Sequence, residues 1–157
     1  TAVTHTGETV SFSAQELDLR YRHSRLSQLP QPCVAASMTV TLQPGDRDTI
    51  RAAMRELNAR RREKQPLTLP SCGSTFKRPE GQFAGTLIEQ CGLKGARVGG
   101  ASVSTLHAGF LVNDRQGTAA DYLALIAHVQ KTVFDQTGVR LEPEVRIIGE
   151  ETTAQII

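Results

Sequence analysis

The sequence contains no tryptophan, and its other aromatic residues are limited to two tyrosines and five phenylalanines. A protein that stacks bases on aromatic side chains needs more of these residues than this chain supplies. An excess of charge of one sign is also missing, because the formal net charge of the 157 residues is only +2. With neither aromatic platforms nor a basic surplus, the sequence argues against nucleic acid as a partner.

Cysteine and long apolar runs are scarce as well. The three cysteines, Cys33, Cys72 and Cys91, are scattered and form no C-x-x-C pair. Their number and spacing argue against a disulfide framework and a metal site, and they fit a reducing cytoplasm. No apolar run approaches the ~20 residues of a membrane span, and no signal peptide is visible. Because the chain starts at Thr1, we expect the native N-terminus to be missing.

The sequence does contain segments with clear helix or strand patterns. Apolar residues recur every three or four positions in the long segments, which is typical of helices with one apolar side. Shorter segments are rich in β-branched and apolar residues, as strands are. The predicted elements are a strand at Val34–Leu42, a helix at Arg47–Lys64, a loop at Leu67–Pro79, a short helix at Phe83–Cys91, strands at Ala96–Ser102 and Ala108–Asn113, a helix at Gly117–Gln136 and a strand at Glu144–Gly149.

This order of elements predicts an α+β fold, with a mixed or antiparallel sheet and helices packed on one face. The first ~30 residues fit this layer poorly, since connections between elements are normally much shorter. We therefore predict that residues 1–32 are the end of a preceding domain and that residues 33–157 form the main domain. Within the first part, Ser13 and Glu16 have the spacing of a capping box at the start of a short helix.

The segment LPSCGSTFKRPEG, at Leu69–Gly81, combines a glycine, hydroxyl side chains and two cations. Ser74 follows the flexible Gly73 in this segment. A surface turn is one interpretation, since Gly-Ser commonly marks loops. The other is a reactive hydroxyl, but neither a G-x-S-x-G motif nor a Ser-His-Asp set supports a nucleophile. A general acid needs only a positioned proton close to the reacting atom, so that role stays open.

Three other candidates also have both a structural and a functional interpretation. Glu144 begins the last predicted strand, where it either pairs with Arg146 or a lysine or points into a cleft. His107 lies between two strands, either as a loop residue or as a contact to a diphosphate or a carbonyl. The segment around Arg22 is either a solvated loop or presents a guanidinium to a carboxylate, which its planar fork suits.

The glycine pair and the basic run have structural interpretations. Gly99 and Gly100 lack the spacing of a phosphate loop and indicate close backbone approach in a strand. The basic run from Arg60 to Lys64 is interpreted as the solvated end of a helix, where cations favour the negative end of the dipole. From the residues alone, the sequence predicts a soluble α+β domain whose basic, hydroxyl-rich loop binds a small anion.

Five segments taken together resemble one enzyme family. They run in order, at a familiar spacing and over nearly the whole chain: YRHSR at Tyr21, RREKQPL at Arg61, PSCGSTFKRPEGQFAGTLIE at Pro70, GLKGARVGGASVSTLHAGFLVN at Gly92 and LEPEVRIIGE at Leu141. This set resembles the C-terminal part of the UDP-N-acetylenolpyruvoylglucosamine reductases, also called UDP-N-acetylmuramate dehydrogenases. The forms STFKRPEG, FAG and HAGF are similar to the shorter class of that flavoenzyme family.

The resemblance implies an oxidoreductase of peptidoglycan synthesis, with a part in cell wall biogenesis, cell shape and cell division. In this family NADPH reduces FAD, and the flavin passes a hydride to the enolpyruvyl ether of UDP-N-acetylglucosamine to give UDP-N-acetylmuramate. By resemblance, Ser74 donates the proton that completes the reduction. Arg22 and Glu144 match the other two catalytic positions, which polarise the substrate carboxylate and stabilise the enol intermediate.

The resemblance also assigns binding residues to both ligands. The residues implied for the UDP-sugar substrate are Tyr21, Lys64, Arg78 and His107, and those implied for the flavin are Arg61 and Arg146. No metal is implied, no membrane insertion is expected, and the bacterial cytoplasm is the expected location.

The sequence departs from the family in one respect, because no glycine-rich segment of an FAD-binding domain precedes these motifs. We therefore expect residues 1–32 to be the end of the FAD-binding domain and residues 33–157 to be the substrate-binding domain. The missing domain would supply most flavin contacts, so we expect this chain alone to be inactive. The alternative hypothesis is a non-catalytic sugar-nucleotide-binding or interaction module.

Overall fold

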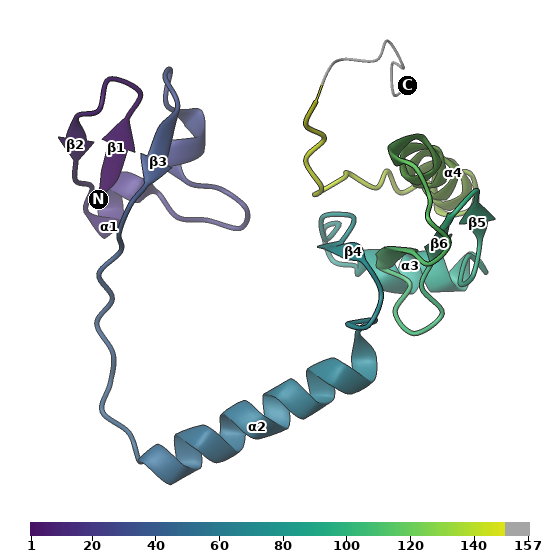
Figure 1. Ribbon diagram of the computed structural model, residues 1–157, viewed down its shortest axis with the longest axis horizontal. Coiled ribbons are helices and arrows are strands. Elements are labelled where there is room, and N and C mark those ends of the chain that lie inside the picture. The colour runs from purple at the N-terminus through teal and green to yellow at the C-terminus, as the bar shows by residue number, and fades with distance from the viewer. Residues whose placement is uncertain (150–157) are drawn as a thin grey trace. The chain divides into compact units, whose positions relative to one another are not determined.

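The computed structural model describes residues 1–149, and the chain divides into two compact units (Figure 1). They are Thr1–Asp46, called unit 1, and Arg47–Ile157, called unit 2. This division differs from the predicted boundary after residue 32, because the strand that begins at Cys33 pairs within unit 1. The assignment of the two parts to flavin and substrate binding stays a prediction.

Unit 1 contains a small antiparallel sheet and two short helical segments. The sheet consists of β1 (Ala2–Thr4), β2 (Thr9–Val10) and β3 (Cys33–Ala35) in the order β2-β1-β3. The helical segments are α1 (Ala14–Leu17) and the 3₁₀ turn η1 (Arg25–Gln28). The predicted capping box is confirmed, since the Glu16 N–H donates to Ser13 Oγ and the Ser13 N–H donates to Glu16 Oε2.

The predicted strand at Val34–Leu42 is wrong over most of its length. Only Cys33–Ala35 is paired, and residues 36–46 have no regular structure. The apolar side chains of Met38, Val40 and Leu42 are exposed. The β-rich composition shows that a segment suits a sheet, but strand formation also needs a partner, and no described strand pairs with residues 36–46.

Unit 2 begins with the predicted helix, α2 (Arg47–Lys64), whose position is confirmed. None of its residues is buried, although Ile50, Met54 and Leu57 form the apolar stripe from which it was predicted. Helix position therefore follows from the periodic pattern, whereas burial of the stripe does not.

The remainder of unit 2 is an α+β layer, as predicted. Its strands are β4 (Ser71–Ser74), β5 (Arg97–Val98), β6 (Ala101–Val103) and β7 (Phe110–Asn113), and every pair in the order β4-β7-β6-β5 is antiparallel. Helices α3 (Ala84–Gln90) and α4 (Ala119–Thr137) pack together, and α4 also contacts β5 and β6 (Figure 1). Apolar side chains from both helices and the sheet form one core.

Helix α4 has the ends and the buried side that its sequence predicts. Four residues of its stripe, Leu125, Ile126, Val129 and Val133, are buried. Thr118 and Asp121 form a capping box at its start, and Gly138 ends it with a φ of 73°. Left-handed φ at this position is the usual reason for glycine after a helix.

Three other predicted segments need correction. The predicted loop at Leu67–Pro79 contains β4, and the predicted strand at Ala96–Ser102 consists of β5 and β6 with a glycine turn between them. No strand forms at Glu144–Gly149, where the nearest pairing is a single bridge between Phe76 and Pro143. The two hydrogen bonds of this bridge run from the Lys77 N–H to the Glu142 carbonyl and from the Glu144 N–H to the Thr75 carbonyl.

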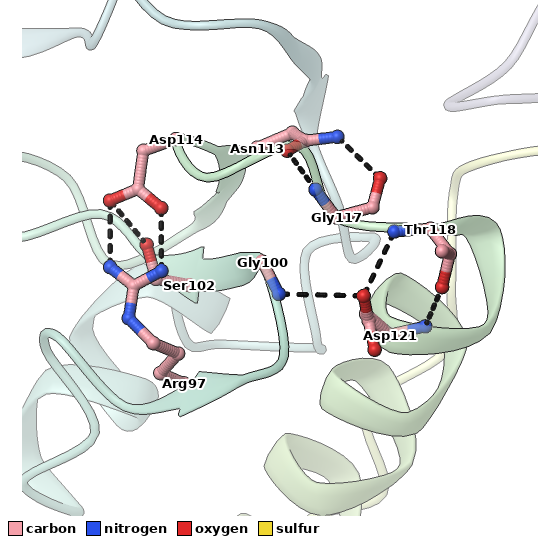
Figure 2. Close-up of polar contacts among 8 residues, drawn as sticks. All are labelled: Arg97, Gly100, Ser102, Asn113, Asp114, Gly117, Thr118 and Asp121. Carbon is pink, nitrogen blue, oxygen red and sulfur yellow. Dashed lines mark hydrogen bonds and ion pairs between the residues drawn. The ribbon is translucent and has the colours of Figure 1, made fainter.

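The glycine turn packs against the start of α4, so the predicted close backbone approach is present, in a turn instead of a strand. A Cβ on Gly100 would lie 2.2 Å from the backbone nitrogen of Gly117. Figure 2 shows the Asp121 carboxylate between this turn and Thr118, accepting from the N–H of Gly100 (3.4 Å) and of Thr118 (2.9 Å). Within residues 1–149, no helix is long and apolar enough to cross a membrane.

Candidate functional site

Strand β4 contains an irregularity directly before Ser74. Ser71 pairs with Val112 and Ser74 with Phe110, so β4 has one more residue than β7 between these two pairs. Gly73, inside this bulge, has a φ of +80°. A left-handed φ is readily adopted by glycine, and bulges of this kind redirect the side chains that follow them.

Ser74 and Glu144 belong to chain segments that lie side by side. Phe76 and Pro143 form the antiparallel bridge, and the N–H of Glu144 donates to the carbonyl of Thr75 over 2.8 Å. Ser74 is exposed and Glu144 is half-buried. The structure therefore brings together the backbones of two residues that are far apart in the sequence.

Thr75, between these two residues, is fully buried. Its N–H donates to the Gly109 carbonyl (2.9 Å), and its Oγ1 accepts from the N–H of Leu111 (3.3 Å). The Tyr122 hydroxyl lies 3.4 Å from this oxygen and donates to the Leu111 carbonyl over 3.2 Å. Burial raises the pKa of the Tyr122 phenol above its ordinary value, so it is protonated and able to donate at neutral pH.

His107 lies in the turn between β6 and β7. Its Nδ1 accepts from the N–H of Gly109 over 3.1 Å, and its ring meets Phe110 edge to face with the centroids 4.9 Å apart. In the neutral ring this leaves Nε2 carrying the proton, available as a donor. His107 lies three residues before Phe110, and Phe110 pairs with Ser74. His107 is therefore at the end of β7 that lies beside Ser74.

Two cations follow β4 along the chain. Lys77 forms an ion pair with Glu142, which joins the β4 segment to the strand-like segment before Glu144. The guanidinium of Arg78 lies over the ring of Phe83, 3.9 Å from its centroid, and its Nε donates to the Gln82 carbonyl. This contact fixes the predicted substrate-binding Arg78 near the start of α3.

The other predicted cations of unit 2 are exposed. Lys64 ends α2, and Arg61, one turn earlier, donates from its Nε to Gln65 Oε1 over 3.0 Å. Arg146 lies in the irregular segment after Pro143. Their exposure leaves these side chains accessible to an anionic ligand.

Tyr21 and Arg22, the remaining predicted residues, lie in unit 1. They occupy the centre of a tight turn in which Arg20 and His23 exchange both backbone hydrogen bonds over 3.1 Å. Asp18 accepts from Arg20 (2.6 Å) and contacts His23 Nε2 (3.1 Å), which braces the turn. Arg22 has a φ of +52°, a conformation that costs a non-glycine residue roughly 1–2 kcal/mol. Asp18 and Gln116 share this backbone conformation, so it is accounted for by turn geometry, and the Arg22 guanidinium lies over the Tyr21 ring, 5.7 Å from its centroid.

The Gly99-Gly100 pair, which was considered as a phosphate loop, does not fit the diphosphate of a flavin. The carboxylate of Asp121 fills the space beside the Gly99-Gly100 turn and accepts the N–H of Gly100. A phosphate there would meet a like charge. Among residues 1–149, no group of three metal-binding side chains is present.

The sequence interpretation missed Thr75 and Tyr122. Neither carries a motif of its own, because their role depends on the pairing of β4 with β7. The one signal in the sequence was the adjacency of Thr75 to the glycine-serine pair.

Comparison with known proteins gives a consistent result for most of the chain. A family model described as UDP-N-acetylenolpyruvoylglucosamine reductase, C-terminal domain, matches residues 65–148. A UDP-N-acetylenolpyruvoylglucosamine reductase from Levilactobacillus brevis is 52% identical over 153 residues, which are 98% of this chain and 50% of the relative. The protein of the same name from Limosilactobacillus fermentum is 51% identical over 152 residues, 97% of this chain and 50% of the relative.

A solved structure agrees with these relatives. The crystal structure of UDP-N-acetylenolpyruvylglucosamine reductase from Thermus caldophilus superimposes with a TM-score of 0.68 at 34% identity. The match covers 91% of this chain and 51% of that one. The chain thus spans about half the length of the curated relatives that it matches.

Proposed function

Because the chain belongs to the UDP-N-acetylenolpyruvoylglucosamine reductase C-terminal domain family, we propose that it is the substrate-binding part of an oxidoreductase. The reaction reduces UDP-N-acetylenolpyruvoylglucosamine to UDP-N-acetylmuramate, a precursor of peptidoglycan. In terms of the two units described above, we propose that unit 2 binds the substrate and that unit 1 completes a flavin-binding domain.

One observation carries the catalytic part of this proposal. The hydrogen bond from the Glu144 N–H to the Thr75 carbonyl places Glu144 beside the segment that begins with Ser74. A proton donor and a carboxylate that act on one enolpyruvyl group need this kind of proximity. The bulge at Gly73 supports the same assignment, because bulges are frequent next to active sites.

The reaction adds a hydride and a proton across the enolpyruvyl double bond, and residues of this chain account for the proton. Ser74 would donate its hydroxyl proton to the carbon next to the one that receives the hydride. A hydroxyl is a weak acid, but a carbanion-like enol is a strong base, so the transfer is feasible. Glu144 and Arg22 would stabilise the enol and its carboxylate, and such electrostatic support is the larger contribution in most enzymes.

The remaining assignments concern binding. We propose that Tyr21, Lys64, Arg78 and His107 bind the UDP-sugar and that Arg61 and Arg146 approach the flavin. Exposed cations and a histidine with Nε2 free to donate suit a diphosphate. FAD and NADPH would act as cofactor and electron donor, with FAD held mainly outside this chain. The three free cysteines fit a cytoplasmic enzyme.

The Ser74→Ala substitution tests the proposal in the reductase that carries this chain together with its flavin-binding domain. Stopped-flow absorbance would follow flavin reduction by NADPH and flavin reoxidation by substrate separately. We expect reoxidation to fall by about 10²- to 10⁴-fold, the usual contribution of a general acid, with reduction nearly unchanged.

Ser71→Ala is the matched control, because Ser71 is exposed on the same strand before the bulge. It should leave both half-reactions as in the wild type. Equal loss of both half-reactions in Ser74→Ala would assign Ser74 a structural role and remove it as proton donor. A wild-type protein that binds UDP-sugars without flavin reoxidation would support the non-catalytic binding module instead.

A further inference from the structure

The environment of Thr75 assigns a role to a residue that does not itself contact the substrate in the proposed mechanism. We propose that Thr75, supported by the Tyr122 hydroxyl, is the positioning residue that sets the separation and orientation of Ser74 and Glu144. This inference rests on the proposed function, because it concerns how that site is held for proton delivery.

The backbone of Thr75 connects the two residues. Ser74 directly precedes Thr75 in the chain. The carbonyl of Thr75 accepts a hydrogen bond from the N–H of Glu144 over 2.8 Å. On the opposite strand, its N–H donates to Gly109 over 2.9 Å. A rotation of the Thr75 peptide would therefore move the Ser74 hydroxyl and the Glu144 backbone together.

The side chain of Thr75 prevents this rotation. Its Oγ1 accepts from the Leu111 N–H over 3.3 Å. Because the Tyr122 hydroxyl proton is donated to the Leu111 carbonyl, the Thr75 hydroxyl donates its own proton to the Tyr122 oxygen, 3.4 Å away. The hydroxyl proton of Tyr122 is thus donated to the Leu111 carbonyl, and that of Thr75 to the Tyr122 oxygen. These contacts among Thr75, Leu111 and Tyr122 join α4 to β7 and to the end of β4, and Cys72 of β4 also interacts with the Tyr122 hydroxyl.

These contacts matter most for the backbone around Ser74 and Glu144, because β4 is short and contains a bulge. Gly73 leaves the preceding backbone conformationally permissive, and the segment after Pro143 has no regular structure. The buried Thr75 hydroxyl is therefore a specific side-chain constraint next to the exposed Ser74 and the half-buried Glu144. A catalytic group must be held within about 0.5 Å of its productive position, so a loose Thr75 would slow proton delivery.

Thr75→Val removes the hydroxyl and keeps the size and β-branching of the side chain. In the flavin-bearing reductase we expect it to lower substrate-driven flavin reoxidation by about tenfold, with NADPH-driven reduction within about twofold of wild type. Tyr122→Phe should give a smaller loss in the same half-reaction. Thr75→Ser, which restores the hydroxyl, should recover most of the rate. The matched control is Thr86→Val, since Thr86 is exposed on α3.

The combination of Thr75→Val with Tyr122→Phe measures the shared role. If the two hydroxyls act through one set of contacts, the double variant should lose less than the product of the single losses. A wild-type rate for Thr75→Val, or equal loss of both half-reactions, would overturn the positioning role while leaving the Ser74 assignment intact.

A second measurement is independent of turnover. Amide NMR spectra of the 157-residue chain would compare Thr75→Val with Thr75→Ser and Thr86→Val. We expect the Glu144 signal, which is remote in the sequence, to shift in the valine variant at position 75 clearly more than in the other two. Unmoved signals would overturn the inference even if the proposed reaction were correct. Shifted signals in this chain, combined with a flavin-bearing reductase that does not reduce the enolpyruvyl substrate, would support the positioning and reject the proposed function.

Discussion

At the scale of single residues, Gly73 determines how Ser74 is presented. Its φ of +80° is strained for any other residue, although a Cβ there would meet nothing within 4 Å. Gly73→Ala should therefore cost about 1–2 kcal/mol in free energy of unfolding from backbone strain alone. It should also slow flavin reoxidation in the full reductase, because relief of the strain would turn Ser74. Urea unfolding and stopped-flow absorbance measure the two effects.

Gly81→Ala is the control for this prediction. Gly81 also has a left-handed φ, +68°, with no neighbour within 4 Å of an added Cβ, but it lies outside β4. We expect a similar loss of stability with normal reoxidation. Equal kinetic loss in both variants would mean that general destabilisation, and not the bulge, affects the reaction.

At the scale of elements, an ion pair joins the edge strand β5 to the end of β7. Arg97 donates to both carboxylate oxygens of Asp114 over 2.6 and 2.7 Å, and Ser102 Oγ donates to the same carboxylate (Figure 2). The hydrogen bonds from Arg97 lower the pKa of Asp114 from 3.8 to about 2. Their stabilisation is present above the unfolded-state pKa and is lost as the pH falls from 3.8 through about 2.

The free energy of unfolding should therefore fall between pH 4 and pH 2, because the Asp114 carboxylate of this pair becomes protonated. Asp114→Asn should be less stable than wild type at pH 6, and the difference should shrink toward pH 2. Urea unfolding followed by circular dichroism at several pH values measures it. A constant difference across this range would show that Asp114 does not titrate as described.

Elements with their own periodic pattern were predictable from the sequence, and elements defined by a partner were not. The stripe of α4 and the glycine after it gave its position and its buried side. Strand β4, with the composition Ser-Cys-Gly-Ser, has no β pattern and exists because β7 pairs with it. Conversely, the β-rich segment after Ala35 and the segment after Pro143 stay irregular because no described strand pairs with them.

The candidate site divides in the same way. The identities of Ser74 and Glu144 came from a family resemblance, and their paired backbones follow from the bridge between Phe76 and Pro143. Thr75 and Tyr122 could not be recognised, because a hydrogen bond between β4 and α4 leaves no trace in either local sequence. That all of these side chains act on one substrate stays a prediction.

At the scale of the whole molecule, the purified 157-residue chain should not retain FAD. The expectation follows from the proposal that FAD is held mainly outside this chain, which spans about half the length of its curated relatives, and the Asp121 carboxylate beside the Gly99-Gly100 turn agrees with it. The visible absorbance spectrum after gel filtration measures bound flavin. A stoichiometric flavin spectrum would mean that residues of this chain bind the cofactor without a further domain.

The distribution of buried side chains has a thermodynamic consequence for the chain as a whole. In residues 1–46, Ala2 is the one buried residue, whereas the apolar core lies in unit 2. A segment of this size with so little buried apolar surface is marginally stable by itself. We therefore expect unit 2, which holds the apolar core, to supply most of the unfolding enthalpy that calorimetry measures.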